Sequence, residues 1–370
     1  MSAGPARKLG VILVHYHTPA LLEAAVAALG ADASSSGLAL EIVVVDNGST
    51  AEERSRLEGF GRRRGLRVCD PGRNLGYAGG INAGAALLPE QDALRAMNTD
   101  VLVEPGCLAA LLGSLAAGAA AAGPAFFWDR ADRRQGFELP PTEAFGFAED
   151  LLRVAASRFG GAWAAAARRR WRRHVRRYLL AEESLPAYDL SGALLMMAAP
   201  AFRRIGGFDD RYAFYFEETD FLQRLRRAGL AARFEPRARA VHLYAQSTPK
   251  DGSAATYFAD SQELFRRTFY GRGGAALLRN LSRGARPPAE PPAEPLAAAG
   301  GWRLDNRARW LELSPSPLGF PAATRRLPAG LGALEPVLPP GLLPQLAAGT
   351  YWLRQLDEHG GELAVGRIEI

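Results

Sequence analysis

LGVILVHY (residues 9–16) and EIVVVDNGST (residues 41–50) each begin as an apolar run rich in branched side chains and end in polar residues. Short apolar runs of this kind are typical of parallel strands that are buried on both faces. Thr18 and Pro19 lie between them and give the start signal of a helix over residues 19–29. Further strands are predicted at residues 66–69 and 93–97. This alternation predicts an α/β fold with a doubly wound, mostly parallel sheet.

Polar clusters follow three of the predicted strands at the point where each strand ends. They are His15-Tyr16-His17, Asp46-Asn47 and Asn98-Thr99-Asp100. In open parallel sheets, ligands bind beyond the carboxyl ends of the strands. The sequence therefore predicts a binding site built from these clusters.

The size and composition of the chain are those of a globular protein. A chain of 370 residues with 48% apolar and 23% charged residues suits one large domain and a small one. Its two cysteines, Cys69 and Cys107, are too few for a disulfide framework. The start, MSAGPARKLG, has no signal-peptide pattern. We therefore expect a cytoplasmic protein, with the inner face of the cell membrane as a second location.

The uncharged stretch at residues 105–128 is long enough to raise the question of a membrane span. It is mostly Ala and Gly, however, and Gly123-Pro124 interrupts it. A buried helix followed by a strand is the preferred interpretation.

Motif spacing excludes two classes of nucleotide-binding protein. The only lysines are Lys8 and Lys250, and neither follows a glycine, so a phosphate-binding loop of the Gly-Lys-Ser/Thr kind is absent. The glycine-rich segment at residues 74–82 does not have the dinucleotide spacing G-x-G-x-x-G. This spacing argues against an oxidoreductase.

The predicted domain organisation has three parts. Residues 1–280 form the nucleotide-binding α/β domain, and residues 281–299 form a proline-rich linker that includes RPPAEPPAEP. Residues 300–370 contain short alternating segments punctuated by Pro and Gly, which predict a small β-sandwich-like accessory domain.

Five segments in a fixed order carry a family resemblance. They are EIVVVDNGST (41–50), RNLGYAGGINAG (73–84), MNTDV (97–101), GGFDDRYAFYFEETDFLQRLRRAG (206–229) and AVHLY (240–244). Together they resemble glycosyltransferase family 2, in particular its bacterial rhamnosyltransferase-like members, over about residues 9–270. The resemblance implies a GT-A fold and an inverting, metal-dependent glycosyltransferase. Such an enzyme moves rhamnose or another hexose from a dTDP- or UDP-sugar to a hydroxyl of a glycan or lipid-linked acceptor in cell-surface polysaccharide synthesis.

The resemblance also implies a donor site. Asp46 corresponds to the family residue that holds the nucleotide base, and Tyr16 lies at the strand end that lines the same pocket. His15 and His17 depart from the family's pattern; they share a strand face, so a metal pair is the alternative to nucleotide contact or packing. A glycine-rich loop that enters a helix suits a diphosphate. Its candidate donor-binding residues are Arg73, Asn74, Gly79 and Asn82.

Catalysis and metal binding are assigned to three further segments. Asp100 corresponds to the second acid of the family's Asp-x-Asp motif and His242 to its metal-ligand histidine, so both are expected to hold Mg²⁺ or Mn²⁺. Glu218 occupies the position of the catalytic base. An apolar wall around that carboxylate would raise its basicity. The remaining candidate substrate-binding residues are Asn98, Asp189, Glu217 and Asp220.

Seven arginines lie between Arg168 and Arg177, and without them the formal net charge falls from +6 to −1. On a helix, Trp171, Val175, Tyr178 and Leu179 form one apolar stripe. Such a helix suits docking on the rest of the protein, an anionic membrane surface or a pyrophosphate-linked lipid. No nucleic-acid-binding module surrounds it, so nucleic acid is not an expected partner.

The sequence alone leaves two rival functions open. It also leaves open whether the chain forms a homodimer. A non-catalytic carbohydrate-binding protein that retains the fold would explain the missing first acid of the Asp-x-Asp motif. A nucleotidyltransferase would also use a metal and a doubly wound sheet. That class needs a glycine-rich loop with a basic residue directly after the first strand, where this chain has His15-Tyr16-His17-Thr18-Pro19.

Overall fold

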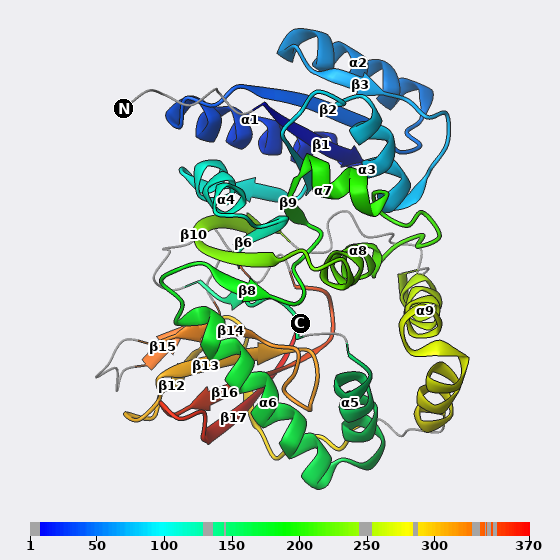
Figure 1. The fold of residues 1–370 in the computed structure, drawn as a ribbon. Coiled ribbons are helices and arrows are strands. Elements are labelled where there is room, and N and C mark those ends of the chain that lie inside the picture. The colour runs from blue at the N-terminus through cyan, green and yellow to red at the C-terminus, as the bar shows by residue number, and fades with distance from the viewer. Residues whose placement is uncertain are drawn as a thin grey trace. The chain divides into compact units, whose positions relative to one another are not determined.

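A computed structural model describes residues 8–128, 136–143, 146–243, 254–283, 288–327, 334–336, 338, 342 and 346–370. The chain divides into two compact units (Figure 1). The first unit comprises Met1–Ala125 and Glu182–Gly271, and the second comprises Phe126–Ala181 and Arg272–Ile370. Each unit is described separately.

The first unit contains the predicted doubly wound sheet. Its strands, in spatial order, are β6 (Ala121–Phe127), β9 (Leu194–Ala198), β4 (Ala93–Asn98), β1 (Leu9–His15), β2 (Leu40–Asp46) and β3 (Arg67–Cys69). β1 is parallel to both β2 and β4, β2 is parallel to β3, and β9 runs antiparallel to β4 and β6. Every residue of β1 is buried, which confirms a strand covered on both faces.

Pairing within this sheet brings the polar strand ends together. His15 lies opposite Asp46, and Val14 lies opposite Asn98. The predicted clusters therefore meet at one edge of the sheet. Beyond that edge, β10 (Ala232–His242) runs antiparallel to β5 (Val101–Val103) and to β8 (Leu185–Ala187).

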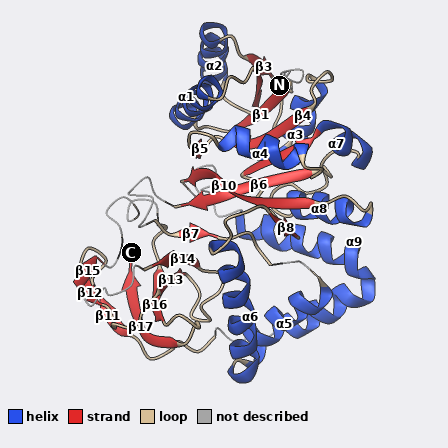
Figure 2. Ribbon diagram, turned by 60° about the vertical axis from the view of Figure 1, so that its left-hand side comes forward, coloured by secondary structure: helices blue, strands red, loops and turns tan. Residues whose placement is uncertain are grey.

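Helices cover the sheet (Figure 2). They are α1 (Pro19–Ser35), α2 (Ala51–Arg64), α3 (Gly76–Ala86), α4 (Cys107–Ala116), α7 (Ala199–Ile205) and α8 (Glu217–Arg227). The first part of α9 (Ala254–Ser282) packs on the segment before α8 through Phe265 and Phe216. α2 begins with a capping box in which Thr50 and Glu53 bond to each other's backbone amides. α3 packs directly on β1, because a Cβ on Gly84 would lie only 2.4 Å from the Ile12 side chain. α9 is broken at Gly271, where the two units divide.

Residues 105–128 form a helix and then a strand, as predicted: α4 is followed by β6. Within the described parts of the chain, no helix combines the length and the apolarity that a membrane span requires.

The second unit combines a helical hairpin with β-strands. α5 (Phe147–Phe159) and α6 (Gly161–Leu179) pack on each other, as Figure 2 shows. The strands are β7 (Glu138–Leu139), β11 (Glu294–Leu296), β12 (Gly301–Arg303), β13 (Trp310–Ser314), β14 (Ala323–Arg326), β15 (Leu334–Pro336), β16 (Thr350–Leu356) and β17 (Glu362–Glu369). β13 pairs antiparallel with β14 and β16, and β16 with β17. The predicted C-terminal strands are therefore present.

This division differs from the boundaries read along the sequence, which placed residues 126–181 in the first domain. The predicted apolar stripe explains the difference. Trp171 and Val175 of α6 are buried in a core that includes Phe320 from the loop between β13 and β14, with Leu179 packed against it. Within the segment predicted as a linker, residues 284–287 lie outside the described part, and β11 pairs with β17.

The amino end of α4 is capped by a residue from another helix. α4 follows Gly106, which has no side chain that could cap it. The buried carboxylate of Asp32 on α1 instead accepts hydrogen bonds from the backbone N–H groups of Gly106 (2.6 Å) and Leu108 (2.8 Å). Negative charge at this position also complements the helix dipole.

We predict that Asp32→Ala lowers the free energy of unfolding by about 1–3 kcal/mol, because it leaves two buried amide donors without a partner. A thermal melt should show a decrease of about 2–4 °C for each kcal/mol. Glu23→Ala, which removes an exposed carboxylate from the same helix, serves as the control. Equal melting temperatures for the two variants would contradict this account of the cap.

Candidate active site

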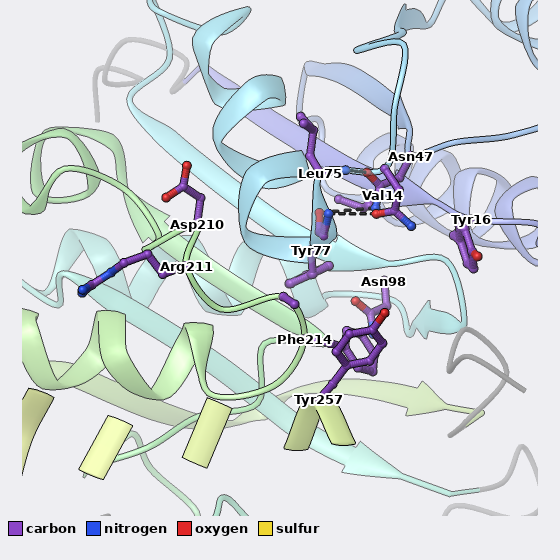
Figure 3. A pocket seen from close by; sticks show the side chains of 13 residues that line it. Val14, Tyr16, Asn47, Leu75, Tyr77, Asn98, Asp210, Arg211, Phe214 and Tyr257 are labelled. Atoms are coloured by element: carbon purple, nitrogen blue, oxygen red, sulfur yellow. Dashed lines mark hydrogen bonds between the residues drawn. The ribbon is translucent and has the colours of Figure 1, made fainter. Parts of the chain in front are cut away.

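A cavity of about 450 Å³ lies at the carboxyl ends of β1, β2 and β4 in the first unit (Figure 3). Segments that are far apart in the sequence form its wall. The lining residues are Val14, Tyr16, Asn47, Asn74, Leu75, Gly76, Tyr77, Asn98, Asp210, Arg211, Ala213, Phe214 and Tyr257. The cavity occupies the place that the sequence predicts for a ligand.

The glycine-rich loop is held against the end of β2 by one amide side chain. Asn47 accepts a hydrogen bond from the Leu75 N–H (2.8 Å) and donates one to the Gly76 carbonyl (3.3 Å). Gly76 has φ 71°, and a Cβ there would lie 2.6 Å from the Ala213 carbonyl oxygen. Glycine is therefore required at this position both for the backbone conformation and for the close approach.

Part of the predicted donor site lies in the cavity wall. Tyr16, Asn74 and Asn98 line the cavity. Asp46 lies beside the wall and is fully buried. Its carboxylate accepts hydrogen bonds from the Ser49 N–H (3.0 Å) and from Arg54 (3.3 Å).

Three residues predicted to bind the diphosphate lie outside the lining. Arg73 is exposed. Asn82 exchanges two hydrogen bonds with the backbone of Phe208, at 2.8 and 3.0 Å. A Cβ on Gly79 would lie 2.9 Å from the Leu75 side chain, so this glycine permits packing within the loop.

The two histidines at the end of β1 have different environments. His15 is buried, and burial lowers the pKa of its imidazole. His17 is exposed and pairs with Glu53 at 2.8 Å. His15 thus packs inside the first unit, whereas the His17 ring contacts a carboxylate of α2.

Asp100 and His242 lie next to each other although they are far apart in the sequence. β10 pairs with β5 so that His242 stands opposite Val101, and the Leu243 N–H donates to the Asp100 carbonyl (2.9 Å). The His242 Nε2 and Asp100 Oδ1 atoms are 3.5 Å apart, and both side chains are buried. Two ligands of one ion, each at about 2.1 Å, stand roughly 3.0–3.5 Å apart, so the pair fits a divalent cation.

Asp100 and His242 form a pair within the part of the chain that the structure describes. Among the residues that the structure describes, no group of three or more His, Cys, Asp or Glu side chains could hold a metal ion.

Glu217 and Glu218 begin α8 in an apolar environment. The two preceding residues, Tyr215 and Phe216, both have positive φ, which is uncommon for bulky side chains and turns the chain sharply into the helix. Burial raises the pKa of both carboxyls, and the charge of Glu218 raises that of Glu217 further. The Oε2 atom of each has no hydrogen-bond partner among the described residues. One carboxyl oxygen of Glu218 is therefore buried without a hydrogen-bond partner among the described residues, and Glu218 itself is not a lining residue of the cavity.

Tyr77 connects the acid pair with the cavity. Its ring lines the cavity, and its hydroxyl donates to the Gly192 carbonyl (2.7 Å). The Gly192 N–H faces Glu218 Oε1 at 3.4 Å. The pKa of Tyr77 is raised well above its ordinary value by burial and then by the charges of Glu217, Glu218 and Asp100. The carboxyls of Glu217, Glu218 and Asp100 thus lie close enough to this phenol to contribute to its raised pKa.

Asp220 and Asp189 make contacts within the protein. Asp220 is buried and pairs with Arg224, whose guanidinium also donates to the carbonyls of Ile205 and Gly207. Asp189 accepts a hydrogen bond from the Thr219 hydroxyl (3.3 Å). In this structure both carboxylates brace the loops around α8.

Several lining residues were not predicted from the sequence. Asn47 and Tyr77 lie within the segments predicted to bind the donor, but the prediction named neighbouring residues and not these two. Tyr257 comes from α9, which no motif marks. Arg211 lines the cavity, but its guanidinium is bound to Asp209, and Figure 3 shows the side chain extending away from the other labelled residues.

Comparison with known proteins agrees with this geometry. Residues 10–175 match the family model for glycosyl transferase family 2. The chain is 29% identical over 227 residues to N-acetylglucosaminyl-diphospho-decaprenol L-rhamnosyltransferase of Mycobacterium tuberculosis, in strain CDC 1551 / Oshkosh and in strain ATCC 25618 / H37Rv. That alignment covers 57% of this chain and 69% of the relative.

A solved structure of GalNAc-T7 with UDP, GalNAc and Mn²⁺ is similar with a TM-score of 0.50 and 14% identity. The match covers 75% of this chain and 54% of that one, so this chain spans about half the length of that relative. The likeness concerns the fold. Residues 10–175 are thus similar to glycosyl transferase family 2, and the solved structure supports the GT-A fold.

Proposed function

We propose that the protein is an inverting, metal-dependent glycosyltransferase that moves a sugar from a dTDP- or UDP-sugar to an acceptor hydroxyl. The observation that carries this proposal is the convergence on Tyr77 of the cavity, the acid pair and Asp100. An acid pair next to a nucleotide-sized cavity is the arrangement that acceptor activation requires.

The donor sugar is assigned from the relative in M. tuberculosis, which is named as an L-rhamnosyltransferase. We propose dTDP-rhamnose as the donor. The name of the same relative motivates the acceptor, a hydroxyl of an N-acetylglucosaminyl-diphospho-lipid. The nucleotide base would lie near Tyr16 and Asn47 at the ends of β1 and β2.

A requirement for Mg²⁺ or Mn²⁺ follows from the charges around the cavity. The charged residues in its described lining are Asp210 and Arg211, and Arg211 is already paired with Asp209. A bound diphosphate thus lacks a free cationic partner in this lining. A divalent ion at Asp100 and His242 would supply that charge and stabilise the departing diphosphate.

Glu218 is the proposed general base. Its free carboxyl oxygen and the raised pKa of that carboxyl suit removal of a proton from the acceptor hydroxyl. The deprotonated oxygen attacks the anomeric carbon of the donor, the bond to the diphosphate breaks, and the proton stays on Glu218. Glu217, whose pKa is raised by burial and by the charge of Glu218, would support the wall of the acceptor site.

We expect Glu218→Gln to lower kcat by about 10²–10⁴-fold and to leave the donor Kd within about twofold, because the amide keeps the shape but cannot accept the proton. Transfer from dTDP-rhamnose to an N-acetylglucosaminyl-diphospho-lipid measures kcat, and calorimetry measures donor binding. Glu182→Gln, a change at an exposed glutamate, is the matched control. Lost donor binding with residual transfer would contradict the role of Glu218. Tight donor binding by the unmodified protein without any turnover would instead favour the carbohydrate-binding alternative.

Asp100→Asn should weaken dTDP-rhamnose binding about 10–100-fold in Mn²⁺, because the variant loses a charged metal ligand. In EDTA the variant and the unmodified protein should bind the donor equally. Asp92→Asn changes an exposed aspartate at the other end of β4 and should have no effect in either buffer. Calorimetric titrations that show the same Mn²⁺ dependence in the unmodified protein and in Asp100→Asn would exclude Asp100 as a ligand.

Glu217 makes stability depend on pH in a defined direction. The pKa of its carboxyl in the folded protein lies above the ordinary value of 4.5, so the folded state favours the protonated form. The contribution of the Glu217 carboxyl to stability is therefore complete below the pKa that this group has in the unfolded chain. That contribution is lost as the pH rises through the pKa of the group in the folded protein. Glu217→Gln removes this loss. We therefore predict that its melting temperature exceeds that of the unmodified protein by an amount that grows from pH 5 to pH 8. A difference that is independent of pH, or that grows toward acid, would contradict burial as the cause.

A further inference from the structure

A second cavity, of about 480 Å³, lies in the second unit along α6. Most of its wall is cationic. It is lined by Arg169, Arg172, Arg173, Arg176, Arg177, Leu180, His359 and Gly360. This cavity is formed entirely by the second unit, while the catalytic residues proposed above belong to the first.

The arginines of α6 fall into two sets that differ in their partners. The inward set is used by the fold. Arg172 pairs with Glu312 (2.9 Å) and Glu362 (3.1 Å), Arg170 pairs with Glu143 (3.1 Å), and Arg168 donates to the Leu318 carbonyl (3.2 Å). Since Glu312 is almost completely buried, the Arg172 contact fixes α6 on β13.

The outward set consists of Arg169, Arg173, Arg176 and Arg177. These residues have the i, i+4, i+7, i+8 spacing of one helix face, opposite the buried stripe that contains Trp171 and Val175. In the described residues, none of these four guanidinium groups pairs with a carboxylate. Four positive charges within about 12 Å of helix repel one another, so the fold by itself gains nothing from this arrangement.

The other wall of the cavity is the turn between β16 and β17. Arg172 also donates to the Gly360 carbonyl (3.1 Å), which holds the turn next to the outward arginines. The one aspartate of that turn, Asp357, accepts hydrogen bonds from the His359 (2.8 Å) and Gly361 (2.7 Å) amides, so its carboxylate is engaged inside the turn. The cavity is thus a formed cationic recess, anchored by the buried Arg172 network.

Exposed apolar side chains accompany the outward arginines on the same hairpin. Leu180 lines the cavity and is 44% exposed. Phe159 and Trp163, at the turn between α5 and α6, are 58% and 51% exposed. Soluble phosphates make no use of apolar groups of this size, whereas a lipid surface offers both phosphate and hydrocarbon.

We propose that this face of α6 binds the phosphate headgroups of an anionic membrane surface. The outward arginines bind phosphate oxygens through charge-assisted hydrogen bonds, for which the guanidinium geometry is well suited. Trp163, Phe159 and Leu180 enter the boundary between headgroups and acyl chains. The proposal requires neither donor nor acceptor, so it stands or falls independently of the proposed transfer reaction.

Co-sedimentation of the full chain with vesicles tests the proposal. Vesicles of phosphatidylcholine alone are compared with vesicles that contain one third phosphatidylglycerol, at low and at high salt. The test variant is Arg169→Gln/Arg173→Gln/Arg177→Gln. The control, Arg62→Gln/Arg63→Gln/Arg64→Gln, removes the same charge from exposed positions at the end of α2.

We expect the unmodified protein and the control to bind the anionic vesicles, with binding that weakens at high salt. Each basic residue near an anionic surface strengthens binding about fivefold, so the test variant should bind about 100-fold more weakly. Trp163→Ser should weaken binding to the same vesicles without changing its salt dependence. Melting temperatures equal to that of the unmodified protein confirm that the variants fold.

Three outcomes would overturn the proposal. The first is equal binding by the test and control variants. The second is binding to neutral and anionic vesicles alike. The third is saturation of the site by inorganic pyrophosphate or by RNA, measured by calorimetry, without any vesicle binding.

Discussion

The hydrogen bond from the Tyr77 hydroxyl to the Gly192 carbonyl is the contact around which the first unit's chemistry is arranged. Tyr77 lies in the first turn of α3, and α3 can approach β1 because glycines face the strand. Gly192 belongs to the segment before β9, and its missing side chain leaves room for Glu218, whose carboxyl carbon would lie 3.2 Å from a Cβ there. One buried bond thereby relates the glycine-rich loop, the central sheet and the start of α8.

Burial and the helix dipole act in opposite directions on the acid pair. The amino end of α8 stabilises negative charge, and backbone hydrogen bonds lower the pKa of both carboxyls. Removal of water from the same groups raises it, and this larger effect prevails in both residues. The aromatic segment before α8 supplies the apolar surroundings: Phe216 is buried and contacts Phe258 and Phe265. A carboxylate of raised basicity at a helix start is therefore a consequence of how tightly this loop is packed.

The arginines of the second unit show how one helix serves two purposes. A buried ion pair alone adds little to stability, because desolvation of both charges offsets their attraction. The contacts of Arg172 with Glu312, Glu362 and the Gly360 carbonyl instead fix the orientation of α6. That orientation determines which arginines remain on the outer face. Four of the seven arginines of this helix thus lie together on its outer face.

From the residues alone, the strands, their parallel order and the edge of the sheet that binds ligands could be inferred, because these follow from apolar runs and from the polar residues that end them. Asn98 and Tyr16 were identified for this reason, whereas Asn74 was identified from the glycine-rich loop. The structure adds which of their neighbours turn toward the cavity. Asn47 lines the cavity while Asp46 points to Ser49 and Arg54, since successive side chains along an extended strand alternate between opposite faces.

The approach of His242 to Asp100 depends on the antiparallel pairing of β10 with β5, a contact between distant segments that no local pattern encodes. The division into two units has the same origin, because residues 126–181 pack on strands that lie more than a hundred residues later in the chain. Local sequence patterns specify elements, whereas long-range packing specifies which of their side chains meet.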